Sequence, residues 1–133
     1  MDVSLEIGHS VRELNTPGVL SRIADAIAQE GISIKGFTTP SQQETGCIRV
    51  YTEDPEVTRR ALETFDFDVR EEEYIVVDLE EGVGQLSRVT TPISEAKIDI
   101  VSAFGTVKGG ESKVIFQTSA NQKALRLIRE EFR

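Results

Sequence analysis

The sequence predicts an α+β protein built from two copies of one strand–helix–strand–strand–helix–strand unit, the second copy without its last strand. Two observations predict this fold. A short motif recurs 66 positions further along the chain (from 18 to 84), and each copy alternates between the apolar periods of strands and of helices. The 133 residues suffice for two very small domains and exclude a large catalytic scaffold.

The internal repeat is carried by the segment GVLSRI at Gly18–Ile23, which returns as GQLSRV at Gly84–Val89. The same shift aligns residues 32–34 and 48–52 with residues 98–100 and 114–118. One register held over more than thirty positions indicates a tandem duplication. We therefore expect two domains, at residues 1–72 and 73–133.

The first copy contains the patterns of four strands and two helices. The strand positions are Val3, Leu5, Ile7, Ile32, Ile34, Ile48, Val50 and Val69. The helical stripes are Leu20, Ile23, Ala24 and Ile27, then Val57, Ala61, Leu62 and Phe65. Thr16-Pro17 and Asp54-Pro55 each join a capping side chain to a first-turn proline and so predict where the helices begin, and Gly31 is expected to end the first helix.

The second copy repeats this order up to its last helix. Its strand positions are Ile75, Val77, Leu79, Ile98, Ile100, Val114 and Phe116. Its helical stripes are Leu86, Val89 and Ile93, then Ala124, Leu125, Ile128 and Phe132. Lys108–Glu111 predicts a tight hairpin turn, and Pro92 is expected to kink or shorten the helix in which it falls.

Each unit is expected to be ferredoxin-like, an antiparallel sheet with two helices on one face. Because the second copy ends after its helix, the strand at Ile75–Leu79 would be an open sheet edge. We expect that edge to be covered, by one long strand at Asp68–Leu79 that serves both copies or by a second chain. Units this small bury little core alone, so a homodimer is expected.

Charge and composition exclude several classes of protein. The 23 acidic and 15 basic residues give a net charge of −8, which repels a phosphate backbone, so no nucleic acid is expected as a partner. No signal peptide and no membrane-length apolar run is found, so we expect no membrane association and a cytoplasmic protein. The single cysteine excludes a disulfide framework and multi-cysteine metal sites.

No catalytic arrangement stands out. His9 is the single histidine and has neither a metal-ligand partner nor a nucleophile motif, so a structural or exposed role is favoured. Cys47 begins a strand and is expected to act as a small apolar residue, and the acids between Asp66 and Glu73 lack the spacing of a calcium loop. The C-x-x-C of metal chaperones and the aromatic strand motif of RNA-recognition domains are missing too. We expect no catalysis, no metal and no cofactor.

One segment does carry chemistry, the turn Asn15–Leu20. Backbone N–H groups at the following helix start favour an anion such as a carboxylate. Gly18 lets a ligand approach the backbone, and the amide of Asn15 offers donors and an acceptor to an ammonium and a carboxylate on one carbon. The alternative is an ordinary capped helix that binds nothing.

The pattern Asn15-x-Pro17-Gly18-x-Leu20, followed by an amphipathic helix and by Ile32-Ser33-Ile34, resembles the opening of an ACT domain, a small regulatory module that binds amino acids. The resemblance covers both copies and implies a tandem ACT protein with no catalytic domain attached. It also implies that modules pair side by side along the strand after the first helix, with the amino acid at that seam.

The resemblance implies two candidate ligand sites. The first comprises Asn15, Thr16, Pro17, Gly18, Val19 and Leu20, with Ile34, Lys35, Gly36 and Phe37 on the seam strand. The second, weaker site comprises Gly82, Val83, Gly84, Gln85 and Leu86, with Ser102, Ala103 and Phe104 opposite.

The second site departs from the family pattern because Glu80 and Glu81 precede its loop. A like charge at about 4 Å costs about 1 kcal/mol in water and about 4 kcal/mol near a protein surface. The helix end contributes about 0.3–1 kcal/mol, so one glutamate cancels it. We therefore expect an amino acid to bind first at Asn15–Leu20.

The expected function is that of a non-catalytic regulatory protein, which binds an amino acid and modulates a partner such as a metabolic enzyme. The alternative is a regulatory subunit that docks on a biosynthetic enzyme without binding a ligand. An enzyme with His9 as its base ranks third. The sequence does not indicate which amino acid binds, because side chains of another module would shape the pocket.

Overall fold

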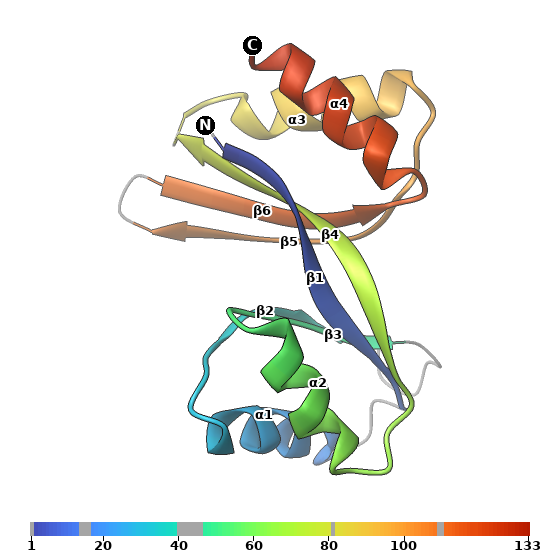
Figure 1. Ribbon diagram of the computed structural model, residues 1–133. Helices are drawn as coiled ribbons and strands as arrows, with labels where there is room; N and C mark the ends of the chain where they lie inside the picture. The colour runs from blue at the N-terminus through green and yellow to red at the C-terminus, as the bar shows by residue number, and fades with distance from the viewer. Residues whose placement is uncertain (1, 14–16, 40–46, 81, 109–110) are drawn as a thin grey trace. The chain divides into compact units, whose positions relative to one another are not determined.

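The computed structural model describes residues 2–13, 17–39, 47–80, 82–108 and 111–133 (Figure 1). Within them lie six strands and four helices. In chain order these are β1 (Asp2–Arg12), α1 (Val19–Gln29), β2 (Ile34–Thr38), β3 (Cys47–Thr52), α2 (Pro55–Glu63), β4 (Val69–Glu80), α3 (Gln85–Glu95), β5 (Ile100–Lys108), β6 (Glu111–Thr118) and α4 (Asn121–Glu131). The predicted α+β class is confirmed.

The chain divides into two compact units, which we call the first unit (residues 7–72) and the second unit (residues 2–6 with 73–133). One division of the chain falls between residues 72 and 73, and residues 2–6 cluster with the second unit.

In the first unit the strands follow the order β2-β3-β1-β4, and β3 is antiparallel to both of its neighbours. Helices α1 and α2 contact each other and cover one face of the sheet (Figure 1). The buried apolar core between the layers comprises Val11, Val19, Ile23, Ile27, Ile48, Val50 and Leu62. The side chain of Asp54 accepts a hydrogen bond from the Val57 N–H at 3.1 Å, so the predicted cap of α2 is confirmed.

In the second unit the order is β5-β6-β4-β1, and β6 is antiparallel to β4 and β5. The buried core comprises Ile75, Val77, Leu79, Val89, Ile93, Ile98, Phe116, Ala124, Leu125 and Ile128. Val3 and Leu5 of β1 pack against this core while partly buried. The Arg129 guanidinium on α4 also donates a hydrogen bond to the Val3 carbonyl at 3.3 Å. Residues 2–6 therefore occupy the place of the fourth strand.

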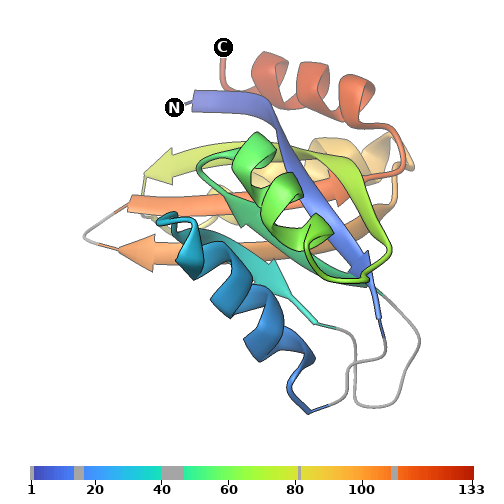
Figure 2. The ribbon, with the colours of Figure 1, turned by 60° about the horizontal axis from the view of Figure 1, so that its bottom comes forward.

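The open edge expected at Ile75–Leu79 is thus closed within the chain. As predicted, one long strand, β4, serves both units, and no strand follows α4 (Figures 1 and 2). The strand beside it is the chain's own N-terminal segment, which the sequence analysis had assigned to the first copy. β1 is long enough to serve both units, since its eleven residues divide into residues 2–6, which belong to the second unit, and residues 7–12, which belong to the first.

The predicted start of the first helix needs correction. Thr16 lies outside the described residues, and α1 begins at Val19 with Gly18 in the N-cap position, so Pro17 precedes the helix instead of opening it. The reason is the left-handed conformation of Gly18 (φ +94°), which cannot be part of the helix. Pro92 does not shorten α3, which has eleven residues like α1. β2 begins at Ile34, two residues later than the apolar pattern suggested.

Candidate functional site

The two helix starts singled out by the repeat have the same backbone geometry. Gly18 (φ +94°) precedes α1 and Gly84 (φ +85°) precedes α3, and no side chain of the described residues caps either helix. In both, the first backbone hydrogen bond runs from the arginine four residues on, from Arg22 N–H to the Gly18 carbonyl (3.0 Å) and from Arg88 N–H to the Gly84 carbonyl (3.1 Å). The earlier N–H groups of each helix are therefore free of side-chain caps and suited to an anion.

At the first candidate site, Asn15 and Thr16 lie outside the described residues. Pro17 and Gly18 are exposed, whereas the side chains of Val19 and Leu20 pack into or against the core of the first unit. At this helix start the exposed groups are thus those of Pro17 and Gly18 and the backbone, while the two apolar side chains hold the helix in place.

The predicted seam strand of this site is β2, an edge strand of the sheet. Ile34 packs against the same core as Val19, so the helix start and the strand belong to one packed unit. Phe37 is 52% exposed. The Lys35 ammonium lies 6.0 Å from the centre of the Tyr51 ring, and a register shift between Ile34 and Gly36 interrupts the pairing with β3.

At the second candidate site the structure forms a cavity of about 280 Å³. Of the predicted residues, Gly82, Gln85 and Leu86 line it, whereas Val83 and Gly84 are exposed. The remaining walls are Leu79, Gly105, Thr106, Ser112, Lys113 and Val114. The predicted seam residues Ser102, Ala103 and Phe104 lie on the same edge strand, β5, but do not line the cavity.

Gly105 and Thr106, which line the cavity, were not among the predicted residues, because the resemblance implied a contact earlier along the strand, at Ser102–Phe104. Gly105 presents no side chain to the cavity, although a Cβ atom built there would make only an ordinary contact, 3.4 Å from the Lys113 carbonyl.

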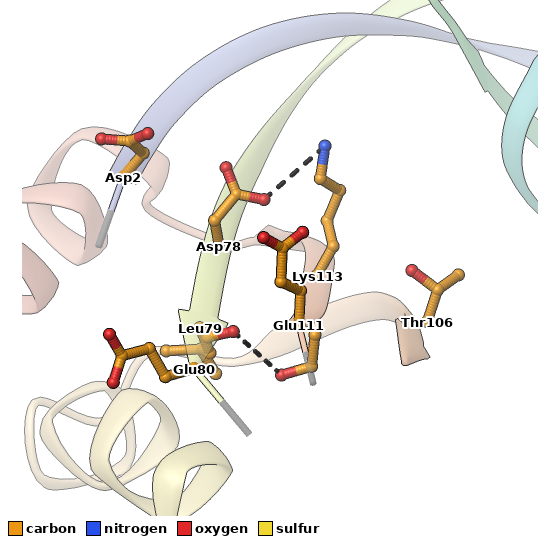
Figure 3. Close-up of a pocket in the computed structure, with 8 residues that line it drawn as sticks. Asp2, Asp78, Leu79, Glu80, Thr106, Glu111 and Lys113 are labelled. Carbon is orange, nitrogen blue, oxygen red and sulfur yellow. Dashed lines mark hydrogen bonds and ion pairs between the residues drawn. The ribbon is translucent and has the colours of Figure 1, made fainter. Parts of the chain in front are cut away.

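A larger and strongly acidic cavity, about 530 Å³, lies beside the ends of β4 and β6 (Figure 3). Four carboxylates line it, those of Asp2, Asp78, Glu80 and Glu111. Glu80 stands opposite Glu111 in the strand register, and the one ammonium among the described lining residues, that of Lys113, lies 3.6 Å from the Asp78 carboxylate.

Four residues line both cavities, namely Leu79, Thr106, Ser112 and Lys113. The acids of the larger cavity therefore lie next to the second candidate site, where they disfavour a carboxylate. Within the described part of the chain no group of acids, histidine or cysteine has the geometry of a metal site.

The candidates for catalysis gain no support from their surroundings. His9 lies within β1 and is only 2% exposed, so its imidazole does not face a site open to a substrate. Cys47 is partly buried at the first position of β3. Glu72 is one of the acids between Asp66 and Glu73, and it lies within β4. Its carboxylate forms an ion pair with the Arg49 guanidinium at 3.1 Å.

Comparison with known proteins shows similarity in structure. No family model and no curated protein matches the sequence. The crystal structure of protein BT0572 from Bacteroides thetaiotaomicron superposes with a TM-score of 0.85 at 19% identity, covering 97% of this chain and 90% of that one.

A regulatory subunit of aspartate kinase and a complete aspartokinase also have similar structures. The ligand-free regulatory subunit of aspartate kinase from Thermus thermophilus gives a TM-score of 0.62 at 14% identity, over 98% of this chain and 97% of that one. Aspartokinase III of E. coli, in complex with lysine and aspartate, gives 0.59 at 14% identity over 98% of this chain and 32% of that one. In the described residues no helix is long and apolar enough to cross a membrane. These similarities show that the chain has the ACT-type fold of aspartate kinase regulatory subunits.

Proposed function

We propose that this protein is a non-catalytic regulatory protein of the cytoplasm, which binds an amino acid through its helix-start loops and thereby modulates a partner. The observation that carries this proposal is the duplication of one uncapped, glycine-preceded helix start, at Gly18 and at Gly84. The fold shared with regulatory subunits of aspartate kinase supports it.

The chemistry of binding follows from the backbone. The free N–H groups at the start of α1 would hold the carboxylate of the amino acid, and the Asn15 amide would take part in holding its ammonium group. The side chain of the ligand would then face the seam strand, Ile34–Phe37, whose Phe37 is exposed. Because β2 and β5 are the two edge strands, each leaves backbone groups for pairing with a second copy of the chain, in a homodimer.

We place the ligand first at Asn15–Leu20, and only weakly at the second site. Glu80 lines the acidic cavity beside the second loop, and its charge opposes a carboxylate bound at the start of α3. The second site does offer a formed cavity, with Leu79, Leu86 and Val114 as apolar walls. A ligand there would bind through its apolar part more than through its carboxylate.

The second candidate function is a regulatory subunit that docks on a biosynthetic enzyme and binds no ligand. The fold shared with a regulatory subunit of aspartate kinase fits this candidate equally well, because a fold by itself does not decide whether a ligand binds. In both proposals the partner is an enzyme of metabolism or its regulator.

Thermal unfolding in the presence of each of the twenty amino acids separates the two. A ligand at 100 times its dissociation constant stabilises the folded state by about 2.7 kcal/mol, a shift of several degrees for a chain of this size. A shift with one or a few amino acids supports the sensor. No shift with any of them at millimolar concentration supports the ligand-free subunit, and co-purification would then identify the enzyme it docks on.

A further inference from the structure

His9 is a titratable group buried in the first unit without a role in the proposed function. It lies in β1 opposite Val50 of β3, so its side chain projects to the face of the sheet that carries the core. Its residue is 2% exposed, and its Nε2 atom has no hydrogen-bond partner among the described residues. An imidazolium needs partners for both nitrogens, so this environment accepts only the neutral ring.

We propose that His9 makes the packing of β1 against α2 acid-sensitive, so that mild acidification loosens the first unit. The neutral imidazole is the form that fits on the buried face of the sheet, which the helices of the first unit cover. Protonation would place a cation in a position that offers no acceptor to Nε2, and the unit can relieve this only by moving α2 away or by admitting water.

The charged groups that influence His9 lie on two elements, α2 and β4. On α2 the Arg59 guanidinium bonds both Glu56 and Glu63, the latter at 2.9 Å, and on β4 the carboxylate is that of Glu71. Burial is the largest influence and lowers the pKa of His9 below its ordinary 6.5. Glu71 opposes this by raising the pKa, Arg59 lowers it further, and the two α2 glutamates raise it. The carboxylates do not outweigh burial.

The sign of the pH effect follows. Since the pKa of His9 is lower in the folded than in the unfolded chain, the unfolded chain binds the proton first. Stability is therefore complete above about pH 6.5 and falls as the pH drops below this value toward the folded pKa. This pH window lies above the range in which unperturbed carboxylates titrate. The loss of stability caused by protonation of His9 can therefore be separated from the loss caused by protonation of carboxylates.

A direct test uses the fact that His9 is the only histidine of the chain. Its ring resonances in an NMR pH titration of the whole protein need no assignment, and we expect a midpoint below 6.5. We also expect the Tm of the wild type to fall between about pH 7.5 and pH 5, and the Tm of His9→Gln, which cannot titrate, to fall less over the same range.

Two further variants distinguish the switch from a packing role. Arg59→Gln removes a cation and should raise the NMR midpoint, whereas Glu71→Gln removes an anion and should lower it. A wild-type midpoint at or above 6.5 would overturn the proposal, even if His9→Gln failed to fold. An equally steep loss of Tm in a folded His9→Gln variant would overturn it as well.

Discussion

The two units are copies of one sequence pattern, yet they complete their sheets differently. The first unit obtains its fourth strand from the segment that follows α2, the start of β4. The second unit has no strand after α4 and uses residues 2–6 from the other end of the chain. The difference teaches that the fourth-strand position of each sheet must be filled because the core needs its apolar cover, whereas the segment of chain that fills it can differ.

The two units also differ in the number of aromatic rings that the arginine of their first helix contacts. Arg22 of α1 lies over two rings, 5.3 Å from the centre of Phe65 and 4.9 Å from that of Phe67. Its counterpart in the repeat, Arg88 of α3, lies over one ring, 4.2 Å from the centre of Phe132. The duplication thus kept the cation and changed the number of aromatic partners.

The largest effect is expected when the borrowed strand is removed. A chain that begins at Ile7 loses the partly buried Val3 and Leu5 and the backbone pairing with β4. We expect the second unit to lose about 3 kcal/mol or more and to associate through the bared edge of β4. Thermal unfolding and light scattering measure both effects.

The matched control for this deletion is Ser4→Ala, which removes only the hydroxyl that donates to Glu6 at 2.9 Å. We expect it to change the stability by less than about 1 kcal/mol. A deletion variant that remained monomeric with an unchanged Tm would show that residues 2–6 do not complete the second unit.

The next largest effect concerns the two helix-start loops as ligand sites. Under the proposed function, Gly18→Asp should weaken amino-acid binding at least about tenfold, or about 1.4 kcal/mol, by placing a carboxylate beside the bound one. Gly84→Asp should leave binding within a few-fold of the wild type. Titration calorimetry with the amino acid found in the thermal screen provides the measurement.

The positive φ of these glycines adds a cost that the sequence alone did not indicate. The carboxylate near a helix start is harmless, but an aspartate at φ +94° is strained by about 1–2 kcal/mol. Gly31→Asp is the matched control, since Gly31 (φ +76°) lies at the other end of α1 and, like Gly18, has open space around a built Cβ. Equal loss of binding in the Gly18 and Gly31 variants would attribute the effect to strain.

A smaller effect is expected for the arginines that contact the aromatic rings. Arg22→Ala should destabilise the first unit by about 1–2 kcal/mol, because each cation–π contact contributes about 0.5–1 kcal/mol. Arg88→Ala should cost the second unit about 0.5–1 kcal/mol, since it loses one ring and a long, exposed ion pair with Glu131 at 3.8 Å. Denaturant unfolding compares them, and a larger loss for Arg88→Ala would contradict the ring count.

The smallest effect concerns the residue that follows the first helix of each unit. Gly31 and Lys97 occupy corresponding positions, and both have a positive φ, +76° and +59°. We expect Lys97→Gly to relieve strain and raise stability by about 0.5–1 kcal/mol, and Gly31→Lys to lower it by a similar amount. Thermal unfolding of the two exchanges against the wild type checks this, and a loss of stability in Lys97→Gly would show that the lysine side chain stabilises the turn by more than the strain costs.

Local patterns in the sequence determined the element types and their order. Apolar alternation at Ile75, Val77 and Leu79 predicted a strand whose three side chains are buried in one core. The Asp54-Pro55 pair predicted the start of α2 to the residue, because a capping side chain and a first-turn proline act within a single turn. The start of α1 was wrong by two residues, since the left-handed backbone of Gly18 is a tertiary outcome that a glycine permits but does not require.

Only the tertiary structure decided which segments share a sheet. The sequence places residues 2–6 in the first copy, and nothing local distinguishes them from residues 7–12 of the same strand. Their assignment to the second unit depends on pairing across more than sixty residues of chain, between β1 and β4. The cavity at Gly82, Gln85 and Leu86 likewise required β5 and β6 to bring Gly105 and Val114 opposite the helix start. Local periodicity records which face of an element is buried, whereas the partner that buries it is chosen by the packing of the whole chain.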